Sequence, residues 1–148
     1  MRKLWLMVMV AVAVVGLVLA FLPAGAEKAV GCQAVPPEYM KMKNPVSLDE
    51  DLARYYQKQF LTKCARCHGE DGAGGSPEDQ AQQYPPANFT SSGFMANCTD
   101  GQLFYQIENG GEGRGDMPAF GKGSAVGWSE EKMWGMVSYL RTIAGMAR

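Results

Sequence analysis

Residues 64–68 read Cys64-Ala65-Arg66-Cys67-His68, and no other stretch of the chain constrains its structure as strongly. Two thiols three residues apart, followed at once by an imidazole, form the pattern of covalent haem attachment. Each thiol can add to one vinyl group of a porphyrin, and the turn between them brings His68 under the iron. His68 is also the only histidine of the chain. The sequence therefore predicts one haem c, bound through Cys64 and Cys67, with His68 as an axial ligand.

Two other chemistries use a Cys-x-x-Cys pair, namely structural zinc and dithiol redox exchange. A zinc site needs four ligands, so Cys32 or Cys98 would have to join the motif. Both are lone cysteines without paired spacing. A reduced zinc–thiolate site also suits the cytosol, whereas the N-terminus described next indicates export. We therefore prefer covalent haem.

The N-terminus has the form of an export signal. Met1-Arg2-Lys3 precedes an uncharged apolar run over residues 4–22, and Pro23-Ala24-Gly25-Ala26 follows. This order predicts a signal peptide over residues 1–26 with cleavage after Ala26. Nineteen apolar residues would also span about 30 Å as a helix, so a retained membrane anchor is the alternative. Either outcome places the remainder in the periplasm or on another extracytoplasmic side.

The length and charge of the remaining chain limit its functions. The 148 residues have room for one domain. Removal of residues 1–26 takes away Arg2 and Lys3 and leaves 12 basic against 15 acidic residues, a formal charge of −3. A nucleic-acid partner requires a basic face, so we expect none. We expect a monomer that meets redox partner proteins through local docking charges.

Two cysteines, Cys32 and Cys98, lie outside the haem motif. An even leftover pair in an oxidising compartment favours a disulfide, which would tie the N-terminal extension to the domain. Two free thiols are the second alternative. Lipidation of Cys32 is the third, because residues 29–32 loosely resemble a lipoprotein cleavage box.

The predicted elements are helices separated by long loops. Residues 27–47 form an extended lead-in that contains Pro36, Pro37 and Pro45. The main domain then covers residues 48–148. Ser47 with Glu50 predicts a capped helix start, and Leu48, Leu52, Tyr56 and Phe60 predict its apolar stripe. This helix leads directly into Cys64.

Residues 69–98 are rich in Gly, Pro, Ser, Asn and Gln, and we expect them to be a loop that wraps the porphyrin. Thr99 with Gln102 predicts a second capped helix that ends at residues 109–111 and buries Leu103, Phe104 and Ile107. A last helix is expected from Ser129 to just before residue 145. No alternating strand pattern occurs. The fold class is therefore all-α, with about three main helices around one haem and long Gly/Pro-rich loops.

The iron needs a second axial partner, and a thioether sulfur is the usual complement to histidine in electron-transfer haems. Met117 lies in the loop Arg114-Gly115-Asp116-Met117-Pro118-Ala119-Phe120, where Pro118 restricts its backbone to extended conformations. On spacing alone Met95 stays open as the alternative. Met133 and Met136 fit the core of the last helix better.

The chain resembles the class I c-type cytochromes, specifically the small bacterial proteins with a single haem. The resemblance covers residues 36–141. It comprises Pro36-Pro37-Glu38-Tyr39 with Asn44-Pro45, Cys64 to Gly69, Pro85-Pro86-Ala87-Asn88-Phe89-Thr90, Asp100-Gly101-x-Leu103-Phe104, Met117-Pro118-Ala119-Phe120, and Trp134 with Tyr139-Leu140-Arg141. It implies haem linked to Cys64 and Cys67, iron bound by His68 and Met117, and first and last helices that cross.

The resemblance also predicts which residues surround the haem. It implies that a backbone carbonyl in the Pro-containing loop after the motif accepts the outer N–H of His68, and Pro77, Pro85 and Pro86 mark the possible positions. Arg114, Trp128 and Tyr84 are candidates for the haem propionates.

Two features depart from the resemblance. Such proteins often have a glycine eight residues before the first haem cysteine, where this chain has Tyr56. The helix crossing is therefore expected to be wider or to shift to Ala53. Cys32 and Cys98 are not part of the family pattern.

These features predict a one-electron carrier in an extracytoplasmic respiratory chain, and not an enzyme. One alternative is a haem subunit fixed in a larger membrane-bound oxidoreductase complex. A second is a catalytic or gas-binding haem with an open distal site, for which Asp116 and Arg114 would be the nearby polar groups.

Overall fold

The computed structural model describes residues 32–146, and the export signal predicted over residues 1–26 lies outside this range. The helices are α2 (Pro37–Met40), α3 (Glu50–Lys63), α4 (Ala65–His68), α5 (Pro77–Gln80), α6 (Ser92–Ala96), α7 (Asp100–Asn109) and α8 (Glu130–Ile143). No strand occurs between residues 32 and 146. The predicted all-α class is confirmed. None of the helices in this range is long and apolar enough to cross a membrane.

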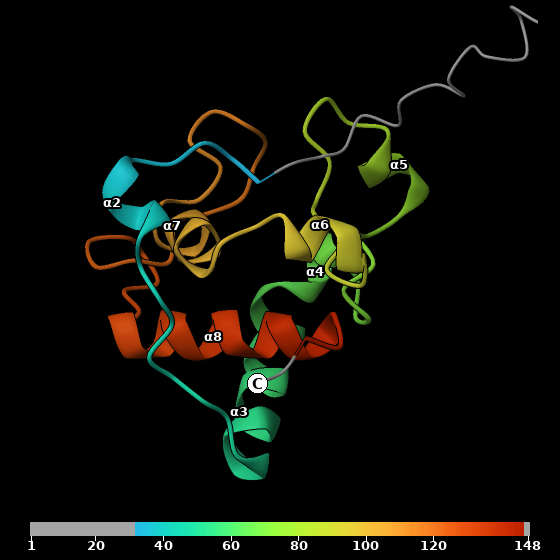
Figure 1. Cartoon of the computed structure of the whole chain (residues 1–148). Coiled ribbons are helices and arrows are strands. Elements are labelled where there is room, and N and C mark those ends of the chain that lie inside the picture. The colour runs from blue at the N-terminus through green and yellow to red at the C-terminus, as the bar shows by residue number, and fades with distance from the viewer. Residues whose placement is uncertain (1–31, 147–148) are drawn as a thin grey trace, which may run out of the picture.

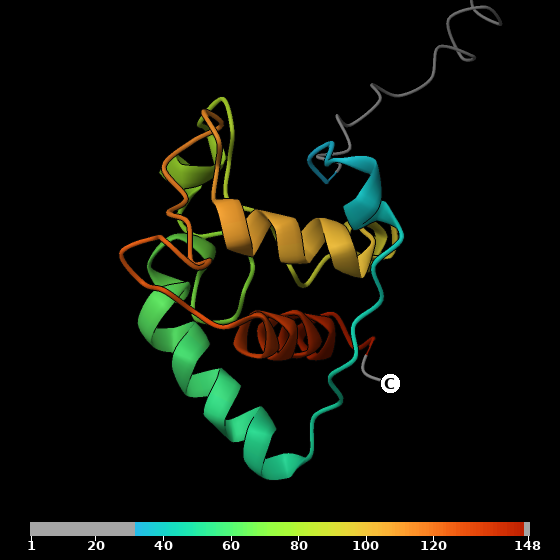
Figure 2. The same ribbon diagram turned by 90° about the vertical axis from the view of Figure 1, so that its left-hand side faces the viewer.

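Helices α3, α7 and α8 are the three long elements, as predicted. Figure 1 shows α8 between the other two, crossing both of them, and Figure 2 gives the same order from the side. The ring of Phe104 on α7 stacks on Trp134 of α8 with centroids 4.2 Å apart. The core is made of the buried side chains Tyr56, Phe60, Phe89, Met95, Cys98, Leu103, Phe104, Ile107, Phe120, Trp128, Met133, Trp134, Met136, Val137 and Leu140.

The predicted starts of two long helices are confirmed. Thr99 and Gln102 form the expected capping box at the start of α7. Ser129 caps α8 by accepting the backbone N–H of Lys132. A capping side chain satisfies a backbone donor that has no partner inside the helix, which typically stabilises the helix by about 1 kcal/mol.

The predicted cap of α3 is wrong. Asp49, not Ser47, accepts the N–H of Leu52, so the helix begins at Glu50. A carboxylate at this position also interacts favourably with the helix dipole. The predicted apolar stripe is only half buried: Tyr56 and Phe60 lie in the core, whereas Leu52 is 40% exposed. The reason is visible in Figure 2, where the first turns of α3 extend beyond α8.

Helices α3 and α8 meet closely at Tyr56, because α8 carries the glycine that α3 lacks. A Cβ atom added at Gly135 would lie 2.0 Å from the Tyr56 ring, so only glycine fits there. The expected widening, or a shift to Ala53, is therefore not needed. The close approach is kept with the large and small residues exchanged between the two helices.

The lead-in is less extended than predicted, since it contains the helical turn α2 and packs along α7 and α8 (Figure 1). The side-chain amide of Asn44 donates to the Trp134 carbonyl at 3.0 Å and to Ser138 Oγ at 2.8 Å. Ser138 Oγ in turn donates to the carbonyl of Val46. The Tyr39 hydroxyl donates to Glu108 at 2.7 Å, which raises the pKa of Tyr39 to about 12.

A disulfide joins Cys32 to Cys98, with their Cα atoms 5.4 Å apart, as the first of the three alternatives predicted. The bond links positions 66 residues apart. A disulfide that closes a long loop typically raises the free energy of unfolding by about 2–4 kcal/mol. Both sulfurs are used in this bond. Cys32 is therefore not available for lipidation.

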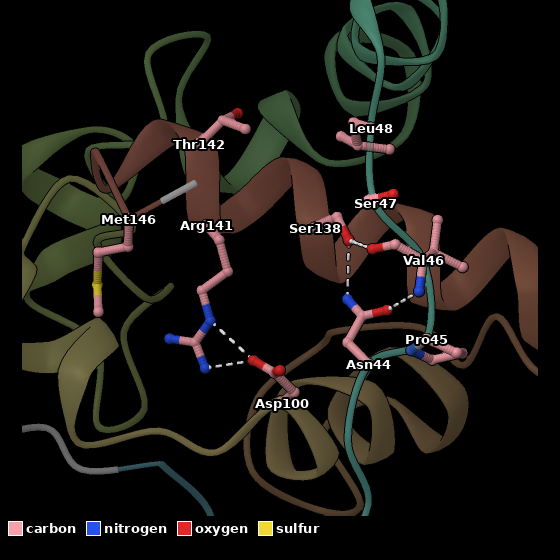
Figure 3. A pocket seen from close by; sticks show the side chains of 10 residues that line it. All are labelled: Asn44, Pro45, Val46, Ser47, Leu48, Asp100, Ser138, Arg141, Thr142 and Met146. Carbon is pink, nitrogen blue, oxygen red and sulfur yellow. Dashed lines mark hydrogen bonds and ion pairs between the residues drawn. The ribbon is translucent and has the colours of Figure 1, made fainter. Parts of the chain in front are cut away.

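Arg141 fixes the same region from α8. Its guanidinium donates to the Asp100 carboxylate at 2.9 and 2.7 Å, to the Cys98 carbonyl at 2.6 Å and to the Met95 carbonyl. Figure 3 shows this ion pair beside a cleft of about 180 Å³, which also includes the Asn44 network. Since its donors are occupied by these partners, Arg141 has a structural role.

Residues 69–98 are more ordered than the predicted loop. They contain α5, capped by Ser76, and α6, capped by Ser91. The Phe89 N–H donates to the Gly72 carbonyl at 2.8 Å and closes the segment on itself. Short caps of this kind occur within Gly- and Ser-rich sequence, and composition alone did not reveal them.

Gly135→Ala tests the helix crossing. The added methyl group must displace Tyr56, so we expect the free energy of unfolding to fall by about 1–3 kcal/mol in urea denaturation. Gly93→Ala on α6 is the matched control, because nothing lies within 4 Å of its Cβ position. It should leave stability unchanged or raise it slightly. Equal stability of the two variants would contradict the crossing described above.

Candidate haem-binding site

The five-residue motif forms a single helical turn at the end of α3. Cys64 lies between the two helices, as the C-cap of α3 and the N-cap of α4. Its carbonyl accepts the N–H groups of Cys67 and His68 at 3.1 and 3.0 Å. Both thiols are free; Cys64 is half-buried and Cys67 is exposed. The fold thus brings the two predicted attachment residues and the predicted ligand together on one turn.

A backbone carbonyl and an aromatic ring orient the imidazole of His68. Its Nδ1 lies 3.1 Å from the Ala87 carbonyl oxygen, and its ring stacks on Phe89 at a centroid distance of 4.6 Å. A neutral imidazole that donates from Nδ1 leaves Nε2 free for a metal. Burial lowers the pKa of His68 and so favours this neutral form, although the Ala87 contact acts in the opposite direction.

The acceptor carbonyl lies where the resemblance implied it, in the Pro-containing loop after the motif. Sequence reasoning did not choose among three prolines, and the structure selects Ala87, the residue after Pro86. The preceding loop is attached to the motif as well. Gly74 donates its N–H to the His68 carbonyl at 2.8 Å, and a Cβ at Gly75 would lie 2.4 Å from the Cys67 carbonyl oxygen.

Met117 is held against the C-terminal end of α7. Its carbonyl accepts the N–H of Gly111 at 2.9 Å, and a Cβ at Gly110 would lie 2.5 Å from the same oxygen. Three residues later, the Phe120 N–H donates to the Ile107 carbonyl at 3.0 Å. The backbone is thus bound to α7 on both sides of Pro118. The Met117 side chain is half-buried and packs against the core.

The loop of Met117 and the loop of Ala87 are neighbours. A Cβ at Gly115 would lie 3.4 Å from the Tyr84 carbonyl oxygen. Tyr84 and Arg114, two candidate propionate partners, are exposed near this junction. Trp128, the third, is buried and packs on Phe120 with centroids 4.8 Å apart. The propionate roles of all three stay predictions.

Met95, the alternative axial ligand, is fully buried in the hydrophobic core on α6. Its carbonyl is bound by Arg141. Met133 and Met136 are also buried, as predicted for core residues. Burial of this kind is the common role of methionine and favours Met117 as the ligand.

The zinc and dithiol alternatives fit the structure poorly. Cys32 and Cys98 are bonded to each other, so neither is a free thiolate for zinc. In the described part of the chain, no three or more His, Cys, Asp or Glu side chains are grouped to hold a metal ion. Burial and the neighbouring Cys67 raise the pKa of Cys64 to about 12. Redox dithiols need a lowered thiol pKa.

The residues present do fit a covalent haem. Two free thiols on one turn match the two attachment points of a porphyrin, and a neutral imidazole with its outer N–H bound presents the nitrogen that iron requires. Phe89 and Phe120 add buried apolar surface beside the two loops.

Comparison with known protein families agrees with this chemistry. The family model described as cytochrome C oxidase, cbb3-type, subunit III matches residues 49–140. The chain belongs to this family. The match shows that the protein is a c-type cytochrome and indicates haem-based electron transfer. It begins at the cap of α3, ends in α8 and includes both loops of the site. No curated protein matches this cytochrome.

Gly75→Ala tests how the loop holds the haem motif of the cytochrome. The methyl group would collide with the Cys67 carbonyl, so we expect less covalent haem per chain and a loss of stability of about 1–3 kcal/mol. The measurements are haem absorbance per protein and urea denaturation.

Gly113→Ala is the control, since Gly113 has nearly the same φ (82° against 80°) and nothing within 4 Å of its Cβ position. Both variants carry a similar backbone strain, so their difference reports the contacts of the added methyl group with the Cys67 carbonyl and with the Asp79 side chain. If the two variants retain haem equally well, the loop does not support the motif.

Proposed function

We propose that this cytochrome is a one-electron carrier with a single covalent haem c, bound by His68 and Met117, in an extracytoplasmic respiratory chain. The observation that carries the proposal is the orientation of His68. Its Nδ1 faces the Ala87 carbonyl at 3.1 Å, next to two free thiols on the same turn. The single Cys-x-x-Cys-His motif supports one haem.

Each residue has a separate task in this proposal. Cys64 and Cys67 would form the thioether bonds, His68 would ligate through Nε2, and Met117 through its sulfur. The bound haem supplies a one-electron iron couple and a large apolar surface. A histidine–methionine pair raises the reduction potential relative to other ligand sets.

The chain's own contribution is a fixed ligand geometry. Phe89 and Ala87 hold the imidazole in one orientation, and Gly111 and Phe120 bind the Met117 loop to α7. When both ligands stay in place in the two oxidation states, little reorganisation accompanies electron transfer. His68 and Met117 are both half-buried, so they would partly shield a bound haem from water, and such shielding tunes the reduction potential.

The open-site alternative is less well supported. Arg114 and Asp116 are both exposed, so neither is held in the dry environment that favours distal acid–base chemistry. The chain has no second histidine for that task. We therefore assign electron transfer and not catalysis.

The predicted signal over residues 1–26 supports an extracytoplasmic location, and the formal charge of −3 supports a protein partner over nucleic acid. Small, short-lived contacts are typical of such redox encounters.

A second candidate is a haem subunit held permanently in a membrane-bound oxidase. The family description names an oxidase subunit, and the run of apolar residues 4–22 is long enough to anchor the chain. Mild detergent extraction distinguishes the two. A carrier should elute alone with a mass lacking residues 1–26, whereas a subunit should keep these residues and elute with larger haem proteins.

Met117→Ala tests the axial ligand. Loss of the sulfur should open the iron, lower the reduction potential and allow the ferrous protein to bind carbon monoxide rapidly. The wild type should bind it only slowly. Met40→Ala is the control, because Met40 is 45% exposed. Rapid binding by the wild type, or an unchanged spectrum in Met117→Ala, would contradict the proposed ligation.

A further inference from the structure

A single ammonium group lies between two aromatic rings at the start of α8. Lys132 Nζ is 4.8 Å from the centroid of Trp128 and 5.6 Å from the centroid of Tyr55. Both distances lie within the range of a cation–π interaction. None of the ion pairs formed between residues 32 and 146 includes Lys132. The two rings are therefore the partners that the structure gives this charge.

The Trp128 ring connects Lys132 to the loop of Met117. Trp128 is 6% exposed, and its backbone N–H donates to the Phe120 carbonyl at 2.7 Å. The rings of Trp128 and Phe120 also pack together, with centroids 4.8 Å apart. Phe120 follows Met117 by only three residues. Movement of Trp128 would consequently remove two of the contacts that hold the C-terminal side of the loop that carries Met117.

The Tyr55 ring connects Lys132 to the other half of the site. Tyr55 lies on α3, the helix that runs directly into Cys64 and His68. It packs edge-on against Tyr56, which in turn contacts Gly135 of α8. Lys132 thus lies between α3, which leads into the haem motif, and Trp128, which packs on Phe120 of the Met117 loop.

We propose that Lys132 is a positioning residue that keeps the Met117 loop closed through Trp128 and so sets how often the Met117 sulfur leaves the iron. This inference rests on the proposed ligation by His68 and Met117. The interaction depends on a positive charge above the ring face, so arginine should replace lysine, and methionine, with similar length but no charge, should not.

The experiment uses the full-length holoprotein with Lys132→Met, Lys132→Arg and Lys122→Met. Lys122→Met removes one exposed positive charge two residues after Phe120 and controls for the change in net charge. The main readout is the rate of carbon monoxide binding to the ferrous form, which is limited by departure of Met117. The second is the temperature at which the ferric absorption band of sulfur ligation disappears.

We expect Lys132→Met to raise the binding rate by about three- to tenfold, the range that loss of such contacts supplies. It should also lower the temperature at which the band is lost. Lys132→Arg should behave like the wild type, and so should Lys122→Met. Equal rates in Lys132→Met and Lys122→Met would overturn the proposal.

Tyr55→Leu provides a second route if Lys132→Met accumulates too little holoprotein. Tyr55 is 42% exposed, so its ring can be removed with little loss of core packing. We expect a smaller rise in the same rate, and an unchanged rate would also overturn the proposal. Failure of the proposed ligation itself gives a different result, because the wild type would then bind carbon monoxide rapidly.

Discussion

The contact between His68 and Ala87 is the constraint on which the site depends. It joins residues 19 apart in sequence and fixes both the orientation of the imidazole and the position of the loop that supplies the carbonyl. The same loop passes Tyr84, where it meets the Met117 loop at Gly115. One hydrogen bond on the histidine side therefore also helps to place the methionine side. These two contacts place the Ala87 loop and the Met117 loop relative to each other, although neither loop contains a long helix.

The three long helices provide the platform for these loops. Helix α3 places the haem motif at its C-terminal end. The Met117 loop is bound by the Ile107 carbonyl of α7 and by the N–H of Gly111, just beyond the end of that helix. Helix α8 crosses between them and is packed tightly against α3 at Gly135. The disulfide and Arg141 then fasten the lead-in and the end of α6 to this platform.

Local signals in the sequence predicted a large part of this structure. The haem motif, the caps at Thr99 and Ser129, and the pairing of Cys32 with Cys98 each depend on a few residues with specific chemistry. The errors concern features that depend on contacts between distant residues. The close crossing at Tyr56 depends on Gly135, which lies opposite it on α8. The composition of residues 69–98 did not indicate the short helices α5 and α6. Ser47 and Asp49 lie two residues apart, and both residue types can cap a helix. The structure uses Asp49. The role of Ala87 was not visible either, because any residue has a backbone carbonyl.

The proposed function requires that one haem is bound covalently to Cys64 and Cys67. The most direct measurement is the intact mass of the protein after export in a host with working haem attachment, taken after extraction with acidified organic solvent. We expect a chain that carries the mass of one haem and keeps its colour through this extraction. An unmodified mass, or haem that passes entirely into the solvent, would contradict it.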